Sequence, residues 1–373
     1  MEKKLAIITT HPIQYQVPLF KELNKIKDLK SYVFYASDHG VNSKGIDKEF
    51  NKRFAWDIPM LEGYKFFFSK KNYNYNSWFL KYIGLSQQLK NIEADFILIL
   101  GWNKLLYLQA FFYAIFNNVP ILLRAENNLG SNNSLLKNAI KKIIFPKFFN
   151  FFYKIFYIGT LNKYFYMHYG VKKNKLLFAP YFVDNDFFKK RHSINNNALN
   201  VLYVGKFISR KRPFDILKTA LILKDYKHIK FSLAGDGPLL QECKNWAKKK
   251  CLNNTNFLGF KNQFEIKKIY NKSHVLVNSS AYETWALVVN EAMASGLPCI
   301  VTNKTGCSVD LVKNNKTGYV YKLGDLKSLS ELILKFYFNK KNLRKMSLGA
   351  KNLIKKYSIK KNSEVISETI FSI

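Results

Sequence analysis

The sequence has few arginines, and this shortage weakens the most obvious explanation of its basic charge. Only six of the 60 basic residues are arginine, whereas proteins that recognise base edges depend on the bidentate guanidinium group. The lysines are spread along the whole chain, as an AT-rich coding sequence would produce. The formal charge of +35 therefore does not by itself predict a nucleic-acid-binding protein.

Paired cysteines and a long N-terminal apolar run are also missing. The four cysteines form no C-x-x-C pair and all lie in the last 131 residues, so neither a zinc site nor a disulfide framework is predicted. The apolar run before His11 has six residues, too few for the core of a signal peptide. We expect a cytoplasmic protein, either free or at the inner face of the cytoplasmic membrane.

Apolar strands alternate with helical stretches in both halves of the chain, which predicts parallel, doubly wound sheets. The segment from Asp184 to Asn200 is rich in asparagine and charge and is predicted to be a linker. We expect an α/β protein in which two Rossmann-like domains, at 1–185 and 198–355, face each other across a ligand-binding cleft. A C-terminal helix at 356–373 is expected to pack back on the N-terminal domain.

The most informative local pattern is YETWALVVNEAMASGLP, which runs from Tyr282 to Pro298. It predicts a helix that begins near Trp285 and ends at Gly296. Glu283 would precede the unpaired N–H groups of this helix, where a bound phosphate is also favoured. Glu291 would lie about two turns further on. The alternative is that Glu283 only caps the helix and Glu291 is a solvated surface carboxylate.

Three further turns follow predicted strands in the same half of the chain. Two of them contain glycine, at 233–238 and 256–260, and each is weak as a separate signal. The third, at 204–213, is either a solvated turn or a pyrophosphate clamp. It carries four cations, Lys206, Arg210, Lys211 and Arg212.

In this order and spacing the four blocks resemble the nucleotide-sugar-binding domain of retaining family-4 glycosyltransferases of the GT-B fold. That family's pattern runs G-R-x4-K-G, G-x-G-P, F-x-G and E-x7-E-A-M-A-x-G-x-P, and the match spans Val201 to Tyr321. The resemblance implies a metal-independent hexosyltransferase that uses a UDP- or GDP-linked sugar as donor and needs no cofactor. Its acceptor would be a saccharide or a lipid-linked molecule in cell-surface polysaccharide or lipopolysaccharide synthesis.

The resemblance also implies a role for each matching residue. Glu283 would face the donor sugar and Glu291 the ribose, while Lys206 and Lys211 would neutralise the departing diphosphate. Phe260 would contact the base through its backbone. The remaining positions expected to bind the donor are Gly205, Arg210, Gly237, Trp285, Ala286 and Leu287. Lys206 stands where arginine is commoner, and Arg212 and Ala286 stand where the family has glycine.

The N-terminal half resembles the family more loosely. Where many members have a Gly-Gly loop, this chain has a segment in which His11 could supply a side-chain donor. Arg124 and Glu126, at the end of another predicted strand, are candidates for holding the acceptor or the sugar. An Arg-Glu pair that only closes the strand end is the alternative.

No acidic residue occurs between Asn127 and Val183, a stretch with nine lysines. It is too interrupted by lysine to span a bilayer. We expect peripheral contact with anionic lipid through residues 136–158. The alternative is a buried helix whose aromatic residues form core.

Other functions remain open at this stage. A nucleotide-sugar isomerase (epimerase) on the same fold, a basic nucleic-acid-binding protein and a catalytically silent binding module are the alternatives. No metal is expected. Asp184 and Asp186 form a D-x-D pattern, but it lies in the predicted linker and not after a strand of a nucleotide site.

Overall fold

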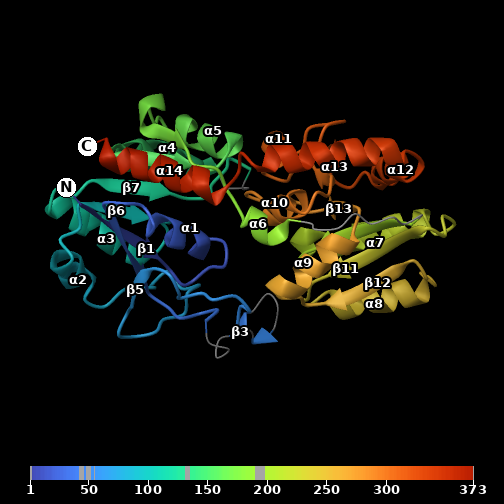
Figure 1. The fold of residues 1–373 in the computed structure, drawn as a ribbon, viewed down its shortest axis with the longest axis horizontal. Helices are drawn as coiled ribbons and strands as arrows, with labels where there is room; N and C mark the ends of the chain where they lie inside the picture. Colours follow the sequence, from blue (N-terminus) through green and yellow to red (C-terminus); the bar gives the residue numbers. More distant parts are fainter. Residues whose placement is uncertain are drawn as a thin grey trace. The chain divides into compact units, whose positions relative to one another are not determined.

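The computed structural model describes residues 2–41, 46–47, 52–53, 55–130, 135–189 and 198–372. The chain forms two compact units. The first comprises Met1–Gly45, Phe54–Tyr181 and Ile359–Ile373, and the second comprises Ile46–Arg53 and Phe182–Ser358 (Figure 1).

The first unit is built on a seven-stranded sheet with the order β5-β2-β1-β6-β7-β8-β9. Its strands pair in parallel, and β6 and β7 are buried along their whole length, as expected when helices cover both faces. The strands are β1 (Lys3–Thr9), β2 (Leu29–Tyr35), β5 (Lys65–Phe68), β6 (Phe96–Ile99), β7 (Ile121–Arg124), β8 (Lys154–Tyr157) and β9 (Leu176–Phe178). The two-residue strands β3 (Ile46–Asp47) and β4 (Lys52–Arg53) pair with each other.

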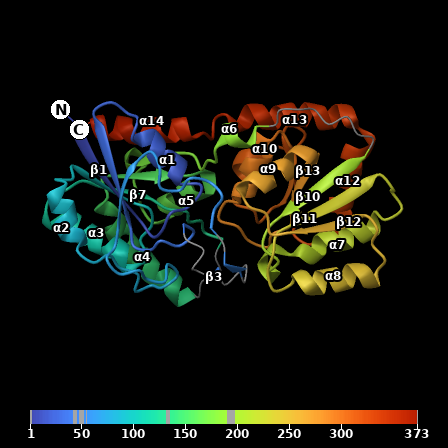
Figure 2. The same ribbon diagram turned by 60° about the horizontal axis from the view of Figure 1, so that its bottom comes forward.

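The helices of the first unit are α1 (Val17–Leu23), α2 (Leu85–Asn91), α3 (Leu105–Phe116), α4 (Leu135–Asn150), α5 (Thr160–His168) and α14 (Ile359–Phe371). Helices α2 to α5 contribute to one apolar core. The C-terminal helix α14 runs beside α1, as Figures 1 and 2 both show. Asn362 of α14 is fully buried and its amide donates to the carbonyl of Pro180 at 2.9 Å.

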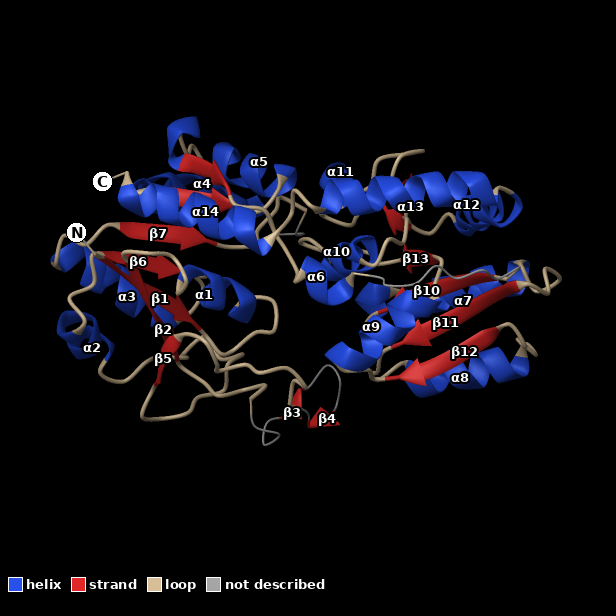
Figure 3. Ribbon diagram, viewed as in Figure 1, coloured by secondary structure: helices blue, strands red, loops and turns tan. Residues whose placement is uncertain are grey.

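The second unit has a six-stranded parallel sheet with the order β12-β11-β10-β13-β14-β15 (Figure 3). Its strands are β10 (Leu199–Val204), β11 (Ile229–Ala234), β12 (Thr255–Gly259), β13 (Val275–Asn278), β14 (Cys299–Thr302) and β15 (Gly318–Tyr321). Its helices are α6 (Asn185–Phe188), α7 (Pro213–Ile222), α8 (Leu240–Lys249), α9 (Gln263–Lys272), α10 (Leu287–Ala294), α11 (Ser308–Leu311), α12 (Leu326–Phe338) and α13 (Lys340–Ile354).

Part of the predicted linker has a structure of its own. The Asp184 carboxylate caps α6 by accepting from the Phe187 N–H at 2.8 Å, which gives the first residue of the D-x-D pattern a capping role. Phe188 is buried, and α6 packs against α10 within the second unit. Residues 190–197 of the predicted linker lie outside the described part of the chain.

Candidate functional site

Glu283 lies in the loop between β13 and α10, and its side chain is buried. The Lys211 ammonium forms an ion pair with Oε1, and Nη1 of Arg210 lies 3.3 Å from Oε2. The Ser280 hydroxyl donates to Oε1 at 2.8 Å. One carboxylate thus holds two cations, which leaves this group with a net positive charge.

Backbone hydrogen bonds bring the two loops of this cluster together. The Ala281 N–H donates to the carbonyl of Arg210 at 2.8 Å. The Ser279 hydroxyl lies 3.0 Å from the carbonyls of both Lys211 and Arg212. These loops follow β10 and β13, which are neighbours in the sheet. The carboxyl ends of parallel neighbours meet at one edge, so residues about 70 positions apart become one site.

Two residues that replace glycine in the family pattern adopt the left-handed backbone conformation that favours glycine. Arg212 has φ 49° and Ala286 has φ 88°. The Arg212 guanidinium makes a two-pronged ion pair with the buried Asp215, at 2.7 and 3.0 Å, and this pair raises the pKa of Arg212. The methyl group of Ala286 can form no ion pair that would offset the strain of this backbone conformation. Ala286 directly precedes the N-terminus of α10.

Glu291 is buried rather than solvated, which rules out the surface alternative. It lies in the second turn of α10 and accepts from the Tyr270 hydroxyl at 2.6 Å. Trp285 is buried too, and its indole N–H donates to the Asn290 amide oxygen at 2.8 Å. The Trp285 side chain therefore anchors the start of α10.

The glycine turns interlock beside this cluster. A Cβ on Gly235 would lie 1.8 Å from the carbonyl oxygen of Gly205, and one on Gly237 would lie 2.8 Å from that of Phe207. The Gly235 N–H donates to the Gly259 carbonyl at 2.8 Å. The turns after β10, β11 and β12 therefore approach as closely as backbones can. Lys206 and Phe260, each half-buried, sit on these turns.

The first unit holds a separate polar pocket of about 230 Å³ at the ends of β6 and β7. Arg124 is buried in it, with its guanidinium carbon 5.1 Å from the centre of the Tyr181 ring. The Tyr181 hydroxyl hydrogen-bonds to the Glu126 carboxylate. Burial raises the pKa of Glu126, while that hydrogen bond and the charge of Arg124 act against the rise. Gln16, Leu100, Gly101, Trp102, Asn103, Ala125 and Asn127 complete the lining.

His11 does not line this pocket. Its Nδ1 lies 2.8 Å from the Thr10 hydroxyl, and its ring centre is 4.5 Å from that of Tyr75 and 5.3 Å from that of His39. The structure thus brings Arg124 and Glu126 together and places His11 in a neighbouring aromatic cluster.

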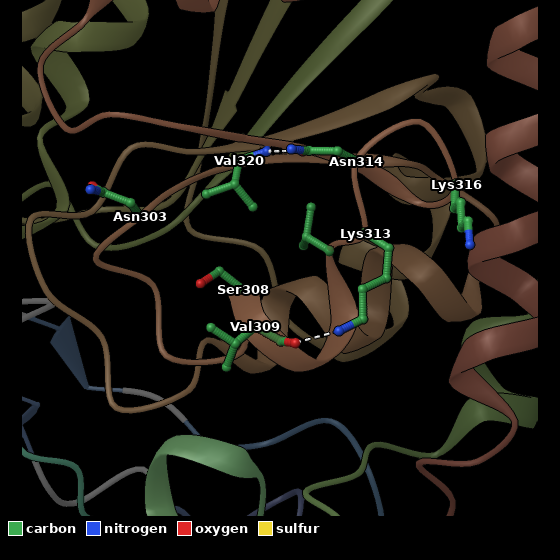
Figure 4. A pocket seen from close by; sticks show the side chains of 8 residues that line it. Asn303, Ser308, Val309, Lys313, Asn314, Lys316 and Val320 are labelled. Atoms are coloured by element: carbon green, nitrogen blue, oxygen red, sulfur yellow. Dashed lines mark hydrogen bonds between the residues drawn. The ribbon is translucent and has the colours of Figure 1, made fainter.

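A larger pocket of about 600 Å³ in the second unit involves none of the predicted site residues. Figure 4 shows Ser308 and Val309 of α11 on one side and Asn314 and Val320 on another. The Asn314 side chain accepts from the N–H of Val320 at 3.0 Å.

The predicted membrane segment at 136–158 divides into two sides. Phe149 and Phe152 are buried in the core, and Phe145 and Phe148 are packed against it, so the alternative of core aromatics is right for these rings. Isoleucines on the opposite side of α4 are exposed. Within the described ranges, no helix has both the length and the apolarity needed to cross a bilayer.

Several residues at these sites carried no decisive signal in the sequence. Ser280, Tyr270 and Tyr181 are recognisable only from the tertiary contacts that they make. Asp215 was detectable in principle, because an acidic residue three positions after Arg212 fits the first turn of a helix.

Known proteins resemble this chain in sequence and in fold. Residues 184–364 match the family model Glycosyl transferases group 1. The Escherichia coli protein named UDP-Gal:alpha-D-GlcNAc-diphosphoundecaprenol alpha-1,3-galactosyltransferase is 29% identical over 194 residues, 48% of either chain. N-acetyl-alpha-D-glucosaminyl L-malate synthase of Bacillus anthracis is 26% identical over 219 residues, 55% of either chain. The matched regions thus span about half the length of these relatives.

The fold can be compared over the whole chain. The crystal structure of Anabaena HepE in complex with UDP and glucose has a TM-score of 0.74 and 14% identity, and covers 100% of both chains. The two relatives are named as a transferase and a synthase, so the isomerase alternative gains no support from them. Residues 184–364 are therefore similar to the glycosyl transferases group 1 family, and the two parallel-sheet units of the chain have the GT-B fold.

Proposed function

We propose that this protein is a retaining glycosyltransferase that moves a hexosyl group from a UDP- or GDP-linked donor to a saccharide or lipid-linked acceptor. The observation that carries the proposal is the cluster of Glu283, Lys211 and Arg210 at the carboxyl edge of the second sheet. Cations on a strand-to-helix loop suit the negative charge that develops on a departing diphosphate. The names of the two relatives, which include a galactosyltransferase, agree with this chemistry.

The donor diphosphate is the leaving group in this scheme. The bond between the anomeric carbon and the phosphate oxygen breaks, and its electron pair stays on the diphosphate. Lys206, Lys211 and Arg210 neutralise that charge in the role that a divalent metal has in other transferases. Backbone N–H groups at Ala286 and Leu287, where α10 begins, meet the distal phosphate.

The acceptor hydroxyl attacks the anomeric carbon from the face that the diphosphate leaves. The new carbon–oxygen bond keeps the original configuration, and the hydroxyl proton passes to the departing phosphate oxygen. Glu283 accepts hydrogen bonds from hydroxyls of the donor sugar, because its carboxylate sits beside the diphosphate cations. Glu291 binds the ribose and the backbone of Phe260 contacts the base. The close turns at Gly205 and Gly237 present backbone to the nucleotide, and Trp285 holds α10 in place.

The polar pocket of the first unit is proposed as the acceptor site. Sugar hydroxyls both donate and accept hydrogen bonds. The pocket offers both kinds of group, in Arg124, Glu126 and the amides of Asn103 and Asn127. At about 230 Å³ the pocket is smaller than the ~300–1,000 Å³ that drug-sized ligands occupy, which suits a single sugar unit. His11 assists from the adjacent cluster, where its ring can donate a hydrogen bond.

Turnover of an identified donor tests the assigned site. Glu283→Ala and Lys211→Ala should each lower sugar transfer on the order of a hundredfold, because each removes a group aimed at transition-state charge. Glu265→Ala and Lys261→Ala are matched controls, since they break an ion pair of 2.7 Å in α9 and its preceding loop. Intact turnover in Glu283→Ala and Lys211→Ala would show that the reaction takes place elsewhere.

We further propose that the enzyme works at the inner face of the cytoplasmic membrane and contacts it through 136–158. The support is the acid-free sequence of this segment and the exposed Lys142 and Lys147 of α4. A lipid-linked acceptor would place the reaction at such a surface.

A further inference from the structure

Helices α3 and α4 expose a set of large apolar side chains that the core does not use. Phe116 is 81% exposed and Ile143 is 69% exposed. Most phenylalanine and isoleucine side chains are buried in soluble proteins. We call the full set the apolar face. It consists of Phe112, Phe116, Ile140, Ile143, Ile144 and Phe151.

The apolar face has helical spacing and is continuous between the two helices. Phe112 and Phe116 are four residues apart on α3, and the isoleucines of α4 recur at intervals of three and four, so each group forms one stripe. The ring of Phe111 joins the stripes. Its centre lies 5.6 Å from that of Phe112 and 5.7 Å from that of Phe151.

The opposite sides of the same helices are used for packing. Phe111 is 5.1 Å from Phe148, and Phe149 is 5.3 Å from Tyr166, measured between ring centres. The core of the first unit is therefore complete without the apolar face. A solvent-exposed apolar stripe on an already packed helix indicates a second contact surface.

The chain segment that carries the apolar face is almost free of acidic residues. Glu126 is the only acidic residue between Phe96 and Val183, and it points into the polar pocket of the first unit. Lys142 and Lys147 are exposed on α4. Lys154 has a structural contact instead, because its ammonium donates to the Asn174 carbonyl at 2.8 Å. The surface that would meet this face must therefore be both apolar and anionic.

We propose that the apolar face binds the surface of an anionic bilayer, with its phenylalanines and isoleucines at the acyl boundary and Lys142 and Lys147 at the lipid phosphates. This proposal extends the membrane contact proposed for 136–158 to α3, and it leaves out the rings of α4 that pack in the core. A twofold pairing of two copies through this face would bring two basic α4 helices together, and neither α3 nor α4 carries an acidic residue to offset their charge, so a bilayer fits better than a second copy. The benefit to catalysis rests on the proposed function, but the binding itself does not.

Flotation of the full-length protein with phosphatidylcholine vesicles, with and without phosphatidylglycerol, tests this proposal without any donor or acceptor. Phe112→Ser combined with Phe116→Ser should lower the partition coefficient on the order of tenfold or more. Lys142→Glu combined with Lys147→Glu should lower it by a similar factor and only on anionic vesicles. Added salt should weaken the wild type on anionic vesicles.

Matched controls come from the second unit. Phe338→Ser replaces a side chain that is 70% exposed, and Lys248→Glu with Lys249→Glu reverses two exposed charges on α8. Both controls should float like the wild type. Thermal midpoints and nucleoside-diphosphate binding of every variant show that it is folded, and they test the donor site independently.

Three flotation results would overturn the proposal. The first is that the wild type does not float, and the second is that the variants of the apolar face float as the wild type does. The third is that the control variants lose as much vesicle binding as the variants of the apolar face. Variants that change the sedimentation coefficient and leave flotation intact would instead identify the apolar face as an interface between copies of the chain, and this too would overturn it.

Discussion

Glu283 forms ion pairs with the same cations that are proposed to bind the donor diphosphate. Lys211 and Arg210 both contact its carboxylate. Binding of the diphosphate would move these cations from carboxylate to phosphate and would leave Glu283 available for sugar hydroxyls. After transfer, Glu283 would recapture the cations and favour release of the nucleotide.

The variant Glu283→Gln separates these two roles. It should bind the nucleoside diphosphate product about fivefold more tightly, equivalent to ~1 kcal/mol, because the amide no longer competes for the cations. Sugar transfer should nevertheless be lost. Isothermal titration of the diphosphate measures the first effect, with Glu265→Gln as the surface control. Weaker diphosphate binding in Glu283→Gln would contradict the exchange of ion pairs.

Ala286 shows what a replaced glycine costs at this site. With φ 88° its Cβ strains the backbone at the N-terminus of α10. Ala286→Gly should therefore raise the free energy of unfolding by about 1 kcal/mol. Denaturant unfolding measures this gain, and Ala281→Gly, which lies in the same loop without a positive φ, should give none. Equal stability of Ala286→Gly and the wild type would show that the site carries no strain.

At the scale of elements, the sequence predicted the second sheet better than the first. The loops after β10, β11, β12 and β13 each carry a local pattern, and the structure brings them to one edge. The strands β5 and β9 carry weaker local patterns, because they are short and only partly buried. Helix α10 begins at Leu287, two residues later than expected, since Ala286 is left-handed.

Contacts between distant elements could not be predicted from local patterns. The hydrogen bond from Tyr270 to Glu291 joins α9 to α10, and that from Tyr181 to Glu126 spans 55 residues. The segment 136–158 was predicted to contact lipid, whereas Phe145, Phe148 and Phe149 of α4 pack in or against the core. Periodicity shows that a helix has two sides but not which side a neighbour covers.

Helix α14 is expected to contribute to the stability of the first unit. Ile366 is completely buried and α14 packs on α1. Ile366→Ala should destabilise the first unit by ~2–5 kcal/mol through lost burial and a cavity. Hydrogen exchange of α1 should accelerate in this variant. Ile222→Ala, at a half-exposed position of α7, is the control, and equal protection of α1 in both variants would contradict this role of α14.

At the scale of the whole molecule, the charge of +35 separates into parts. Most of it is dispersed lysine that needs no functional explanation. Lys206, Arg210 and Lys211 are the cations of the proposed donor site, and Arg212 is held by Asp215 instead. Lys142 and Lys147 lie on the helix that carries part of the apolar face. They are proposed to bind the membrane and not to take part in the reaction.

Thermal denaturation in the presence of UDP-, GDP-, ADP- and CMP-linked sugars tests the central claim most directly. One donor should stabilise the wild type by about 2.7 kcal/mol at a hundred times its dissociation constant, and Lys211→Ala should lose most of this gain while Lys261→Ala keeps it. If no nucleotide sugar stabilises the wild type, or if Lys211→Ala is stabilised as much as the wild type, the second unit does not hold the donor at the Glu283 cluster.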